Sequence, residues 1–312
     1  LFSRNYLQFH ESCCSLVKEY FLTQMLSTLE EKTEGTTDSS NNECEDEWEG
    51  IETREINWAG DNNNPQRPPV DNITDKDLWE YFNSRDMSEY HTYVTFWPEK
   101  GHPFSIRSFF CRPSRLSKQL VRDGTLICSI AQCRFVDEDE THVRALKSLY
   151  RFVTGTLFDC PRFGPHWEDI GFQGTDPKND LRGVGFLGLM QALHFASNKA
   201  CRPLFLQLYS LSRDPVQEFP MMVLSINVTR IAYQALKDGV LNRECNARLD
   251  VLGVFNSFYV AIMFYIWKLW KTQKKTIKDA GYVLKDAEGF ACKHVYKVLK
   301  NAEEYLSQPD QL

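Results

Sequence analysis

The sequence predicts an all-α protein, and three observations lead to this prediction. Apolar residues from Asp77 onward recur at three- and four-residue spacing, the period of a helix with one buried face. Helical patterns of this kind follow one another from Asp180 almost to the end of the chain. No alternating apolar and polar run is long enough to indicate a strand, and no internal repeat is present. We therefore expect one multi-helix domain.

The composition is that of a globular protein with one strongly charged segment. Of the 312 residues, 42% are hydrophobic and 25% are charged, so the chain can bury one substantial core. The net charge of −6 gives no reason to expect a nucleic-acid partner. Residues 30–55 hold eleven acidic side chains against Lys32 and Arg54, a net charge of −9, which leaves +3 for the rest. A mildly basic body suits a phosphate-bearing partner, although a solvated acidic linker beside a neutral domain explains the same numbers.

The cysteines and the start of the chain indicate the compartment. No C-x-x-C pair occurs among the ten cysteines, which removes the main support for a zinc ribbon or a thioredoxin-like site. Many cysteines stand among apolar residues, where a free buried thiol is common. The first residues lack the cationic start and the small-residue cleavage site of a secretory signal. We therefore expect a cytoplasmic protein without a metal or another cofactor.

Composition divides the chain into four regions. Residues 1–29 can form an amphipathic helical segment, and residues 30–72 are acidic, then rich in asparagine and proline. The second region has too little apolar surface to offset the entropy of ordering it, so we expect it to be disordered. Residues 73–110 form a helical and irregular lead-in, and residues 111–307 form the main helical domain.

Within the main domain the pattern predicts a series of helices and one long loop. The expected helices cover 116–133 with a possible break at Gly124, a segment opened by the acidic cluster 137–140, then about 180–197, 203–211, 219–237 and 249–271, and a last one from Thr276. Glycines and prolines exclude a long helix or a regular strand over 158–180. Loops of this length inside a compact domain are usually functional or disordered, and the aromatic residues in this one favour order.

The apolar run 251–267 requires a test for a membrane span. It has 17 residues, is interrupted by Gly253 and Asn256, and falls short of the about 20 residues that a span needs. A helix buried on all sides in a helical core has the same composition. We therefore expect a core helix and no transmembrane segment.

The segment 166–189 carries the most informative motif. Gly183, Gly185 and Gly188 spell G-x-G-x-x-G, but a turn-rich loop rather than a strand precedes them, and no carboxylate follows before Asp214. No Gly-Lys pair exists that could form a Walker A loop. The chain is therefore not expected to bind a nucleotide itself. The glycines are expected to let a neighbouring helix or another protein approach the backbone closely.

Arg182 is the candidate functional residue of this segment. With Asn179 or Asp180 as the N-cap, Arg182 falls in the first turn of the expected helix, where the helix dipole disfavours a cation. A side chain that contradicts a local rule is a functional candidate, and a guanidinium presents a planar fork of donors to phosphate oxygens. The alternative is a structural clamp, in which Arg182 pairs with Asp176 or Asp180. Chemistry alone favours the clamp.

The residues from Trp167 to Leu189 match a known pattern. They read W-x-x-x-G-F-Q-x-x-x-P-x-x-D-L-R-G-x-G-x-L-G-L, which resembles the signature of the ELMO domain. The similarity extends from about residue 111 through 306 and is greatest to the ELMO domain-containing proteins. The family commonly has threonine where Asn179 stands, and both residues can cap a helix.

The resemblance implies an all-α domain that activates Arf-like and Arf GTPases in their GTP-bound form. It implies an arginine finger, which falls on Arg182 and reverses the preference for a clamp. It also marks the residues that bind the partner or shape the motif: Trp167, Gly171, Phe172, Gln173, Pro177, Asp180, Gly183 and Gly185. Among them, Trp167 and Phe172 are expected to anchor the loop, and Gln173 either bonds within the loop or orients a partner.

Two other functions remain open. A non-catalytic scaffold of the ELMO type would bind a GTPase or an exchange factor, although the armadillo-type repeats, pleckstrin-homology domain and proline-rich tail of larger ELMO proteins are not visible. A cytoskeletal or membrane-edge adaptor would use the lysine-bearing C-terminal helix or residues 1–29. Chemistry by the chain itself is not expected, because His166 and Glu168 lack the P-C-x-x-C of a zinc deaminase and Cys160 lacks a third orienting group.

Overall fold

The computed structural model describes residues 72–91, Phe96 and residues 114–308. The expected helical segment 1–29, nearly all of the expected linker 30–72 and much of the lead-in 73–110 lie outside the described residues. The described residues form helices and turns and contain no strand, so the all-α prediction is confirmed.

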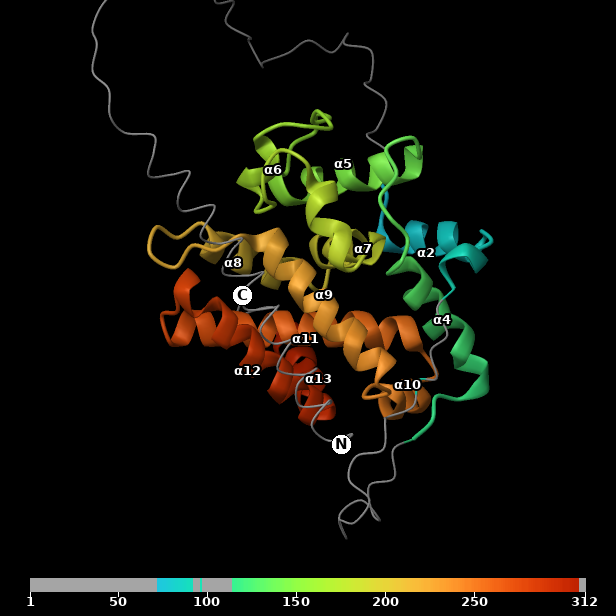
Figure 1. Cartoon of the computed structure of the whole chain (residues 1–312). Helices are drawn as coiled ribbons and strands as arrows, with labels where there is room; N and C mark the ends of the chain where they lie inside the picture. Colours follow the sequence, from blue (N-terminus) through green and yellow to red (C-terminus); the bar gives the residue numbers. More distant parts are fainter. Residues whose placement is uncertain (1–71, 92–95, 97–113, 309–312) are drawn as a thin grey trace, which may run out of the picture. The chain divides into compact units, whose positions relative to one another are not determined.

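Helices account for most of the described chain (Figure 1). The α-helices are α2 (Asp75–Asn83), α4 (Val121–Ile130), α5 (Glu140–Thr154), α6 (His166–Asp169), α7 (Phe186–Ser197), α8 (Arg202–Ser212), α9 (Met221–Lys237), α10 (Asn242–Arg248), α11 (Val251–Thr272), α12 (Ala280–Lys293) and α13 (Val295–Leu306). The 3₁₀ helices are η1 (Ser88–Tyr90), η2 (Lys118–Leu120), η3 (Pro177–Gly183) and η4 (Ile277–Asp279).

α7 and α11 form the centre of the fold. α7 contacts α2, α4, α5, α8, α9 and η3, and α11 contacts α4, α7, α8, α9, α10, α12 and α13 (Figure 1). Every residue of α7 from Phe186 to Ala196 is buried. A helix enclosed in this way has to be apolar on all sides, which explains why α7 has no polar face.

α11 is the apolar helix that required the membrane test. It has 22 residues, and it is the one helix of the described chain whose length and composition would allow it to cross a membrane. Within the domain, 61% of its apolar window is buried. Asp250 caps its start, with Oδ1 accepting the Gly253 N–H at 2.8 Å. α11 therefore packs as a core helix against its neighbours, as the sequence predicted.

Several helix boundaries differ from the prediction, and α10 was not predicted. Gly124 does not break its helix but lies inside α4, where a Cβ would meet the Phe96 ring at 3.0 Å. The helix expected from Thr276 is divided at His294 into α12 and α13. The helix expected from residue 180 begins only at Phe186, since Gly185 leaves the helical conformation with a φ of +54°.

Candidate functional site

The short helix η3 carries Arg182. Asp176 is its N-cap, with Oδ1 accepting the Lys178 N–H at 3.0 Å. Pro177 occupies the first position, where its missing N–H removes no helical hydrogen bond. Pro177, Asp180 and Leu181 are buried, whereas Lys178, Asn179, Arg182 and Gly183 are exposed. The turn is therefore fixed at its start and along its inner side.

The expected position of Arg182 within a helix is wrong. Neither Asn179 nor Asp180 caps the helix that begins at Phe186, and Arg182 lies in the last turn of η3. The carbonyl groups at the end of a helix favour a cation rather than disfavour it. The dipole argument for Arg182 thus fails, and its candidacy depends on its exposure and on the groups that hold it.

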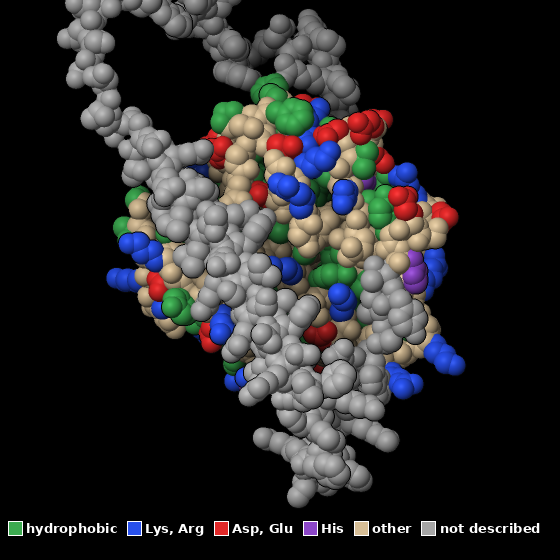
Figure 2. Space-filling view, in the orientation of Figure 1, with side chains coloured by type: hydrophobic (Ala, Val, Ile, Leu, Met, Phe, Trp, Pro, Cys, Tyr) green, Lys and Arg blue, Asp and Glu red, His purple; other side chains and the backbone are tan. Residues whose placement is uncertain are grey.

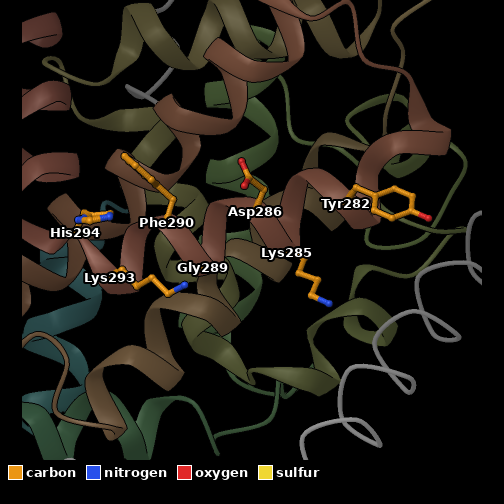
Figure 3. A pocket seen from close by; sticks show the side chains of 7 residues that line it. All are labelled: Tyr282, Lys285, Asp286, Gly289, Phe290, Lys293 and His294. Atoms are coloured by element: carbon orange, nitrogen blue, oxygen red, sulfur yellow. The ribbon is translucent and has the colours of Figure 1, made fainter. Parts of the chain in front are cut away.

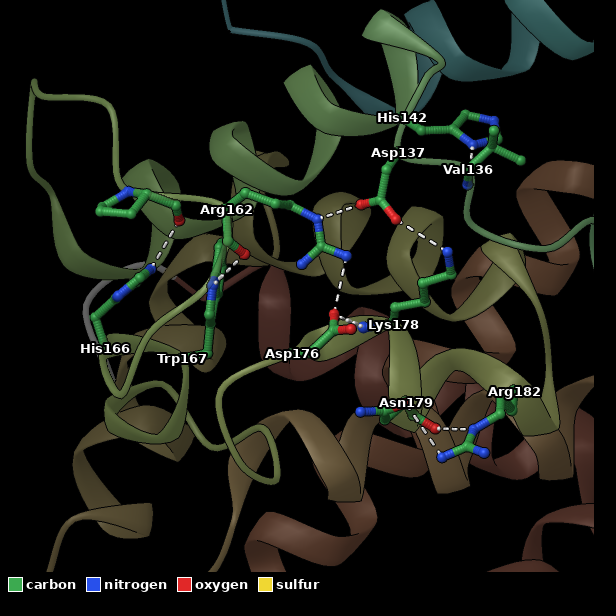
Figure 4. Close-up of polar contacts among 11 residues, drawn as sticks. Val136, Asp137, His142, Arg162, His166, Trp167, Asp176, Lys178, Asn179 and Arg182 are labelled. Carbon is green, nitrogen blue, oxygen red and sulfur yellow. Dashed lines mark hydrogen bonds and ion pairs between the residues drawn. The ribbon is translucent and has the colours of Figure 1, made fainter.

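The Arg182 guanidinium is exposed and bonded to neutral oxygens (Figure 4). Nε donates to the backbone oxygen of Asn179 at 3.0 Å, and Nη2 donates to Asn179 Oδ1 at 3.2 Å. Arg182 forms no ion pair with any residue that the structure describes. The face of the molecule in Figure 2 carries Lys and Arg side chains together with Asp and Glu side chains. The charge of the Arg182 guanidinium itself is not compensated by an ion pair with a described carboxylate.

The two carboxylates of the alternative clamp have other partners. Asp176 forms an ion pair with Arg162, whose Nη2 lies 2.8 Å from Oδ1. Asp180 is buried, and its Oδ2 accepts the backbone N–H of Gln173 at 2.7 Å. Burial raises the pKa of Asp180 to about 6, although the Gln173 bond and the charge of Arg182 both act to lower it. The structure thus gives Arg182 no carboxylate clamp.

Asp180→Asn is expected to stabilise the protein at pH 7.5 and to lose this effect in acid. The folded pKa of about 6 lies above the reference value of 3.8, so the folded state binds more protons between these values. The stability contribution of Asp180 therefore falls as the pH rises through this window. An amide carries no charge to bury, and its oxygen still accepts from Gln173.

Urea unfolding should show a gain on the order of 1–3 kcal/mol at pH 7.5 and almost none at pH 4. A gain of the same size at both pH values would show that the buried charge is not its cause.

Arg162 fastens the loop to the start of α5 and to η3 (Figure 4). Its side chain is only 15% exposed, and its Nε lies 2.6 Å from Asp137 Oδ1 in addition to the pair with Asp176. Lys178 Nζ binds the other oxygen of Asp137 at 2.9 Å. The sequence did not predict this cluster, because Arg162 and Lys178 stand 25 and 41 positions from Asp137. Only the folded chain brings the charges together.

Arg162→Ala is expected to lower the free energy of unfolding by about 2 kcal/mol, because it leaves Asp176 without its ion pair and Asp137 with Lys178 alone. It also removes the contacts of the guanidinium with the rings of Phe135 and Phe163, whose centroids lie 4.9 and 4.5 Å away. Since Asp176 caps η3, the turn that presents Arg182 should loosen as well. Urea unfolding measures the first effect.

Arg248→Ala is the matched control for this variant. Arg248 pairs with Glu303 at 2.6 Å, but both side chains are substantially exposed, so its loss should cost less than about 0.5 kcal/mol. Equal losses in the two variants would mean that Arg162 is an ordinary surface arginine.

Two aromatic motif residues support the loop from inside. Trp167 is fully buried in α6, and its Nε1 donates to the backbone oxygen of Arg162 at 3.0 Å. Phe172 is 4% exposed and meets the Trp167 ring edge-on, with centroids 6.0 Å apart. These two buried side chains hold the loop in place from inside.

Gly171 joins the loop to α9. Gly171 has a φ of +93°, and its carbonyl oxygen accepts the N–H groups of Met222 and Val223, both at 3.1 Å. These N–H groups belong to the first turn of α9 and have no partner within their own helix. A Cβ at Gly171 would lie 2.3 Å from the backbone nitrogen of Met221, so no larger residue fits without displacement.

The two glycines that flank Val184 differ in their surroundings. Gly183 is exposed, and no atom lies within 4 Å of the position that a Cβ would take. Gly185, in contrast, is buried, and a Cβ there would lie 2.5 Å from the backbone oxygen of Ala131. Gly185 thus serves internal packing, and only Gly183 leaves room for another protein.

The loop also contains a thiol and an imidazole, those of Cys160 and His166. Cys160 is buried, and burial raises the pKa of its thiol. His166 Nε2 lies 3.0 Å from the backbone oxygen of Pro161 (Figure 4). Among the described residues, no group of three or more side chains could hold a metal ion.

Comparison with known proteins gives similarities to one family. Residues 125–284 match the ELMO/CED-12 family. The chain is 36% identical to ELMO domain-containing protein 3 of Homo sapiens and 37% identical to that of Mus musculus, in both cases over 265 residues that make up 85% of this chain and 69% of the relative. It is 29% identical over 181 residues to ELMO domain-containing protein 2 of Bos taurus, which is 57% of this chain and 60% of that protein. No solved structure matches the chain.

Proposed function

The chain belongs to the ELMO/CED-12 family, and from this premise we propose that it activates GTP hydrolysis on a small GTPase of the Arf or Arf-like class. Arg182 enters the active site of the GTP-bound partner and stabilises the negative charge that spreads over the transferring phosphoryl group. The chain completes the partner's site and binds no nucleotide of its own. The reaction takes place in the cytoplasm.

The observation that carries the proposal is the way in which Arg182 is held. Two neutral oxygens of Asn179 orient the guanidinium from one edge, at 3.0 and 3.2 Å. Exposed hydrogen bonds of this kind contribute only about 1 kcal/mol each, so the side chain can exchange them for phosphate oxygens at small cost. A carboxylate partner would compete with the phosphate for the same charge, and Arg182 has none among the described residues.

The support beneath η3 makes the position of Arg182 precise. Arg162 ties the loop to Asp137 and Asp176, and the carbonyl group of Gly171 ties it to α9. Charge stabilisation of a transition state depends on donors that are in place before the reaction, because reorganising them costs part of their effect. Because the loop is held by both Arg162 and Gly171, the turn that carries Arg182 is in place before a partner binds.

A panel of GTP-loaded Arf and Arf-like GTPases tests the proposal. We expect catalytic amounts of the full chain to accelerate single-turnover GTP hydrolysis by at least one member. If no member responds while a pull-down recovers a GTPase or an exchange factor, the chain is a scaffold and the proposal is wrong.

A further inference from the structure

We propose that the loop 157–163 binds an apolar patch on the same GTPase that receives Arg182. The inference rests on the proposed function, because it names the surface through which that partner is held. The loop leads from α5 to α6, and the chain continues from α6 into η3. One segment of the chain thus supplies both contacts, the apolar loop for affinity and Arg182 for the rate.

Exposed apolar side chains are concentrated in this loop. Ten large apolar or aromatic residues are exposed in the described part of the chain, and three of them stand within the seven positions of the loop. Leu157 is 76% exposed, Phe158 63% and Phe163 58%. Single exposed apolar side chains are common and need no explanation, whereas several close together mark a contact surface. Aromatic rings are also among the groups enriched at protein interfaces.

The backbone of the loop is fixed from several directions. Asp159 pairs with Lys147 on α5 at 3.0 Å and with Arg151 on the same helix. The backbone oxygen of Arg162 accepts the Trp167 Nε1–H at 3.0 Å, and the Arg162 side chain pairs with two carboxylates. An apolar side chain on a fixed backbone loses less conformational entropy when a partner covers it. The loop is thus preorganised for a protein contact.

An open depression of about 280 Å³ lies between this loop and α5. Phe158 and Pro161 line it on the loop side, and Tyr150 lines it on α5. Asp159, the carboxylate in its lining, is neutralised by its ion pairs with α5. The depression is smaller than the about 300–1,000 Å³ of most small-molecule sites. Its size fits one apolar side chain that protrudes from another protein.

The contacts of Phe163 connect the loop to the turn that carries Arg182. The Phe163 ring centroid lies 4.5 Å from Cζ of Arg162, and Arg162 Nη2 lies 2.8 Å from Oδ1 of Asp176 (Figure 4). Asp176 caps η3, and Arg182 follows six residues later, about 12 Å at the rise of a 3₁₀ helix. A specific protein contact covers about 800 Å² of each partner, which corresponds to a width of about 30 Å. A GTPase that takes up Arg182 is therefore wide enough to cover Phe163 as well.

The larger depression of about 580 Å³ along α12 does not have these properties (Figure 3). Lys285 and Asp286 both line it, so it presents charges of both signs. All of its lining residues belong to α12 or to His294, and none belongs to the loop, to α5 or to η3. Tyr282 in its lining and Tyr296 on α13 are exposed rings, and they supply a matched control.

Leu157→Ser/Phe163→Ser is expected to raise the chain concentration that gives half-maximal stimulation of the GTPase by at least about tenfold. Apolar contacts remote from the phosphate are the same in the ground state and the transition state, so maximal hydrolysis at saturating chain should stay within about twofold. Affinity for the partner loaded with a non-hydrolysable GTP analogue should fall by the same factor. Phe163→Leu keeps an apolar side chain and should bind within about threefold of the wild type.

Tyr282→Ser/Tyr296→Ser removes two exposed rings elsewhere and should bind and stimulate like the wild type; an equal loss in it would overturn the assignment. Unchanged affinity of the loop variant beside a stimulating wild type would overturn this inference and leave the proposed function standing. A lower maximal rate, or a lower urea midpoint that accounts for the loss, would show that the loop only supports η3 and would overturn it too.

Binding to the GTPase separates the two proposals. A wild-type chain that binds without accelerating hydrolysis, and a loop variant that loses this binding, would overturn the proposed function alone. A wild-type chain that neither binds nor stimulates any member of the panel would overturn both.

Discussion

Arg182→Lys is expected to lower stimulated GTP hydrolysis by a factor of about 10³ or more, while the affinity for the GTP-bound partner changes by less than about threefold. Lysine keeps the positive charge that contributes to encounter, but it has no planar fork to bond two phosphate oxygens at once. An interaction made only in the transition state appears in the rate and not in binding.

Single-turnover hydrolysis at saturating chain measures the rate, and binding to the partner loaded with a non-hydrolysable GTP analogue measures affinity. Because Arg182 is exposed and bonded, within the described part of the chain, only to Asn179, the variant should unfold at the same urea concentration as the wild type. Arg243→Lys is the matched control, an exposed arginine on α10, and should hydrolyse at the wild-type rate. A loss of binding or of stability that accounts for the whole effect would contradict the finger and support a structural role.

The regular helices were predictable because their signal is local. The helix expected over 219–237 corresponds to α9, and the one expected over 249–271 corresponds to α11, each within two residues at both ends. In such segments the spacing of apolar residues over several turns specifies which side is buried, and no information from elsewhere in the chain is needed.

The interruptions were not predictable, because distant groups cause them. Gly185 takes a left-handed φ where its backbone meets Ala131 and Cys133, more than 50 positions away in the sequence. The ion pairs of Arg162 likewise depend on partners that only the fold brings near. The motif identifies Arg182, whereas the physical argument from the helix dipole was wrong. Asn179, which the sequence suggests as a helix cap, instead accepts the hydrogen bonds of the Arg182 guanidinium.

Gly185→Ala is expected to lower the free energy of unfolding by about 3–5 kcal/mol. At a φ of +54° and a ψ of −150° almost every residue other than glycine is strained. The added Cβ would also lie 2.5 Å from the oxygen of Ala131 and 2.6 Å from that of Cys133. Both are backbone atoms, so relief requires that the segment after α4 move away from α7. That movement would break the 2.7 Å bond from the Phe186 N–H to the Cys133 oxygen.

Gly183→Ala is the matched control, two residues away in the same motif. Its Cβ meets open space, so thermal and urea unfolding should differ from the wild type by less than about 1 kcal/mol. If both variants unfold like the wild type, the backbone at Gly185 does not need glycine and the division between η3 and α7 is wrong. Gly183→Ala also reports on the partner, because a methyl group at this exposed position obstructs any backbone that approaches Arg182 closely. Lower stimulated hydrolysis with unchanged stability would place the GTPase against Gly183, and the motif would then combine one glycine for packing with one for contact.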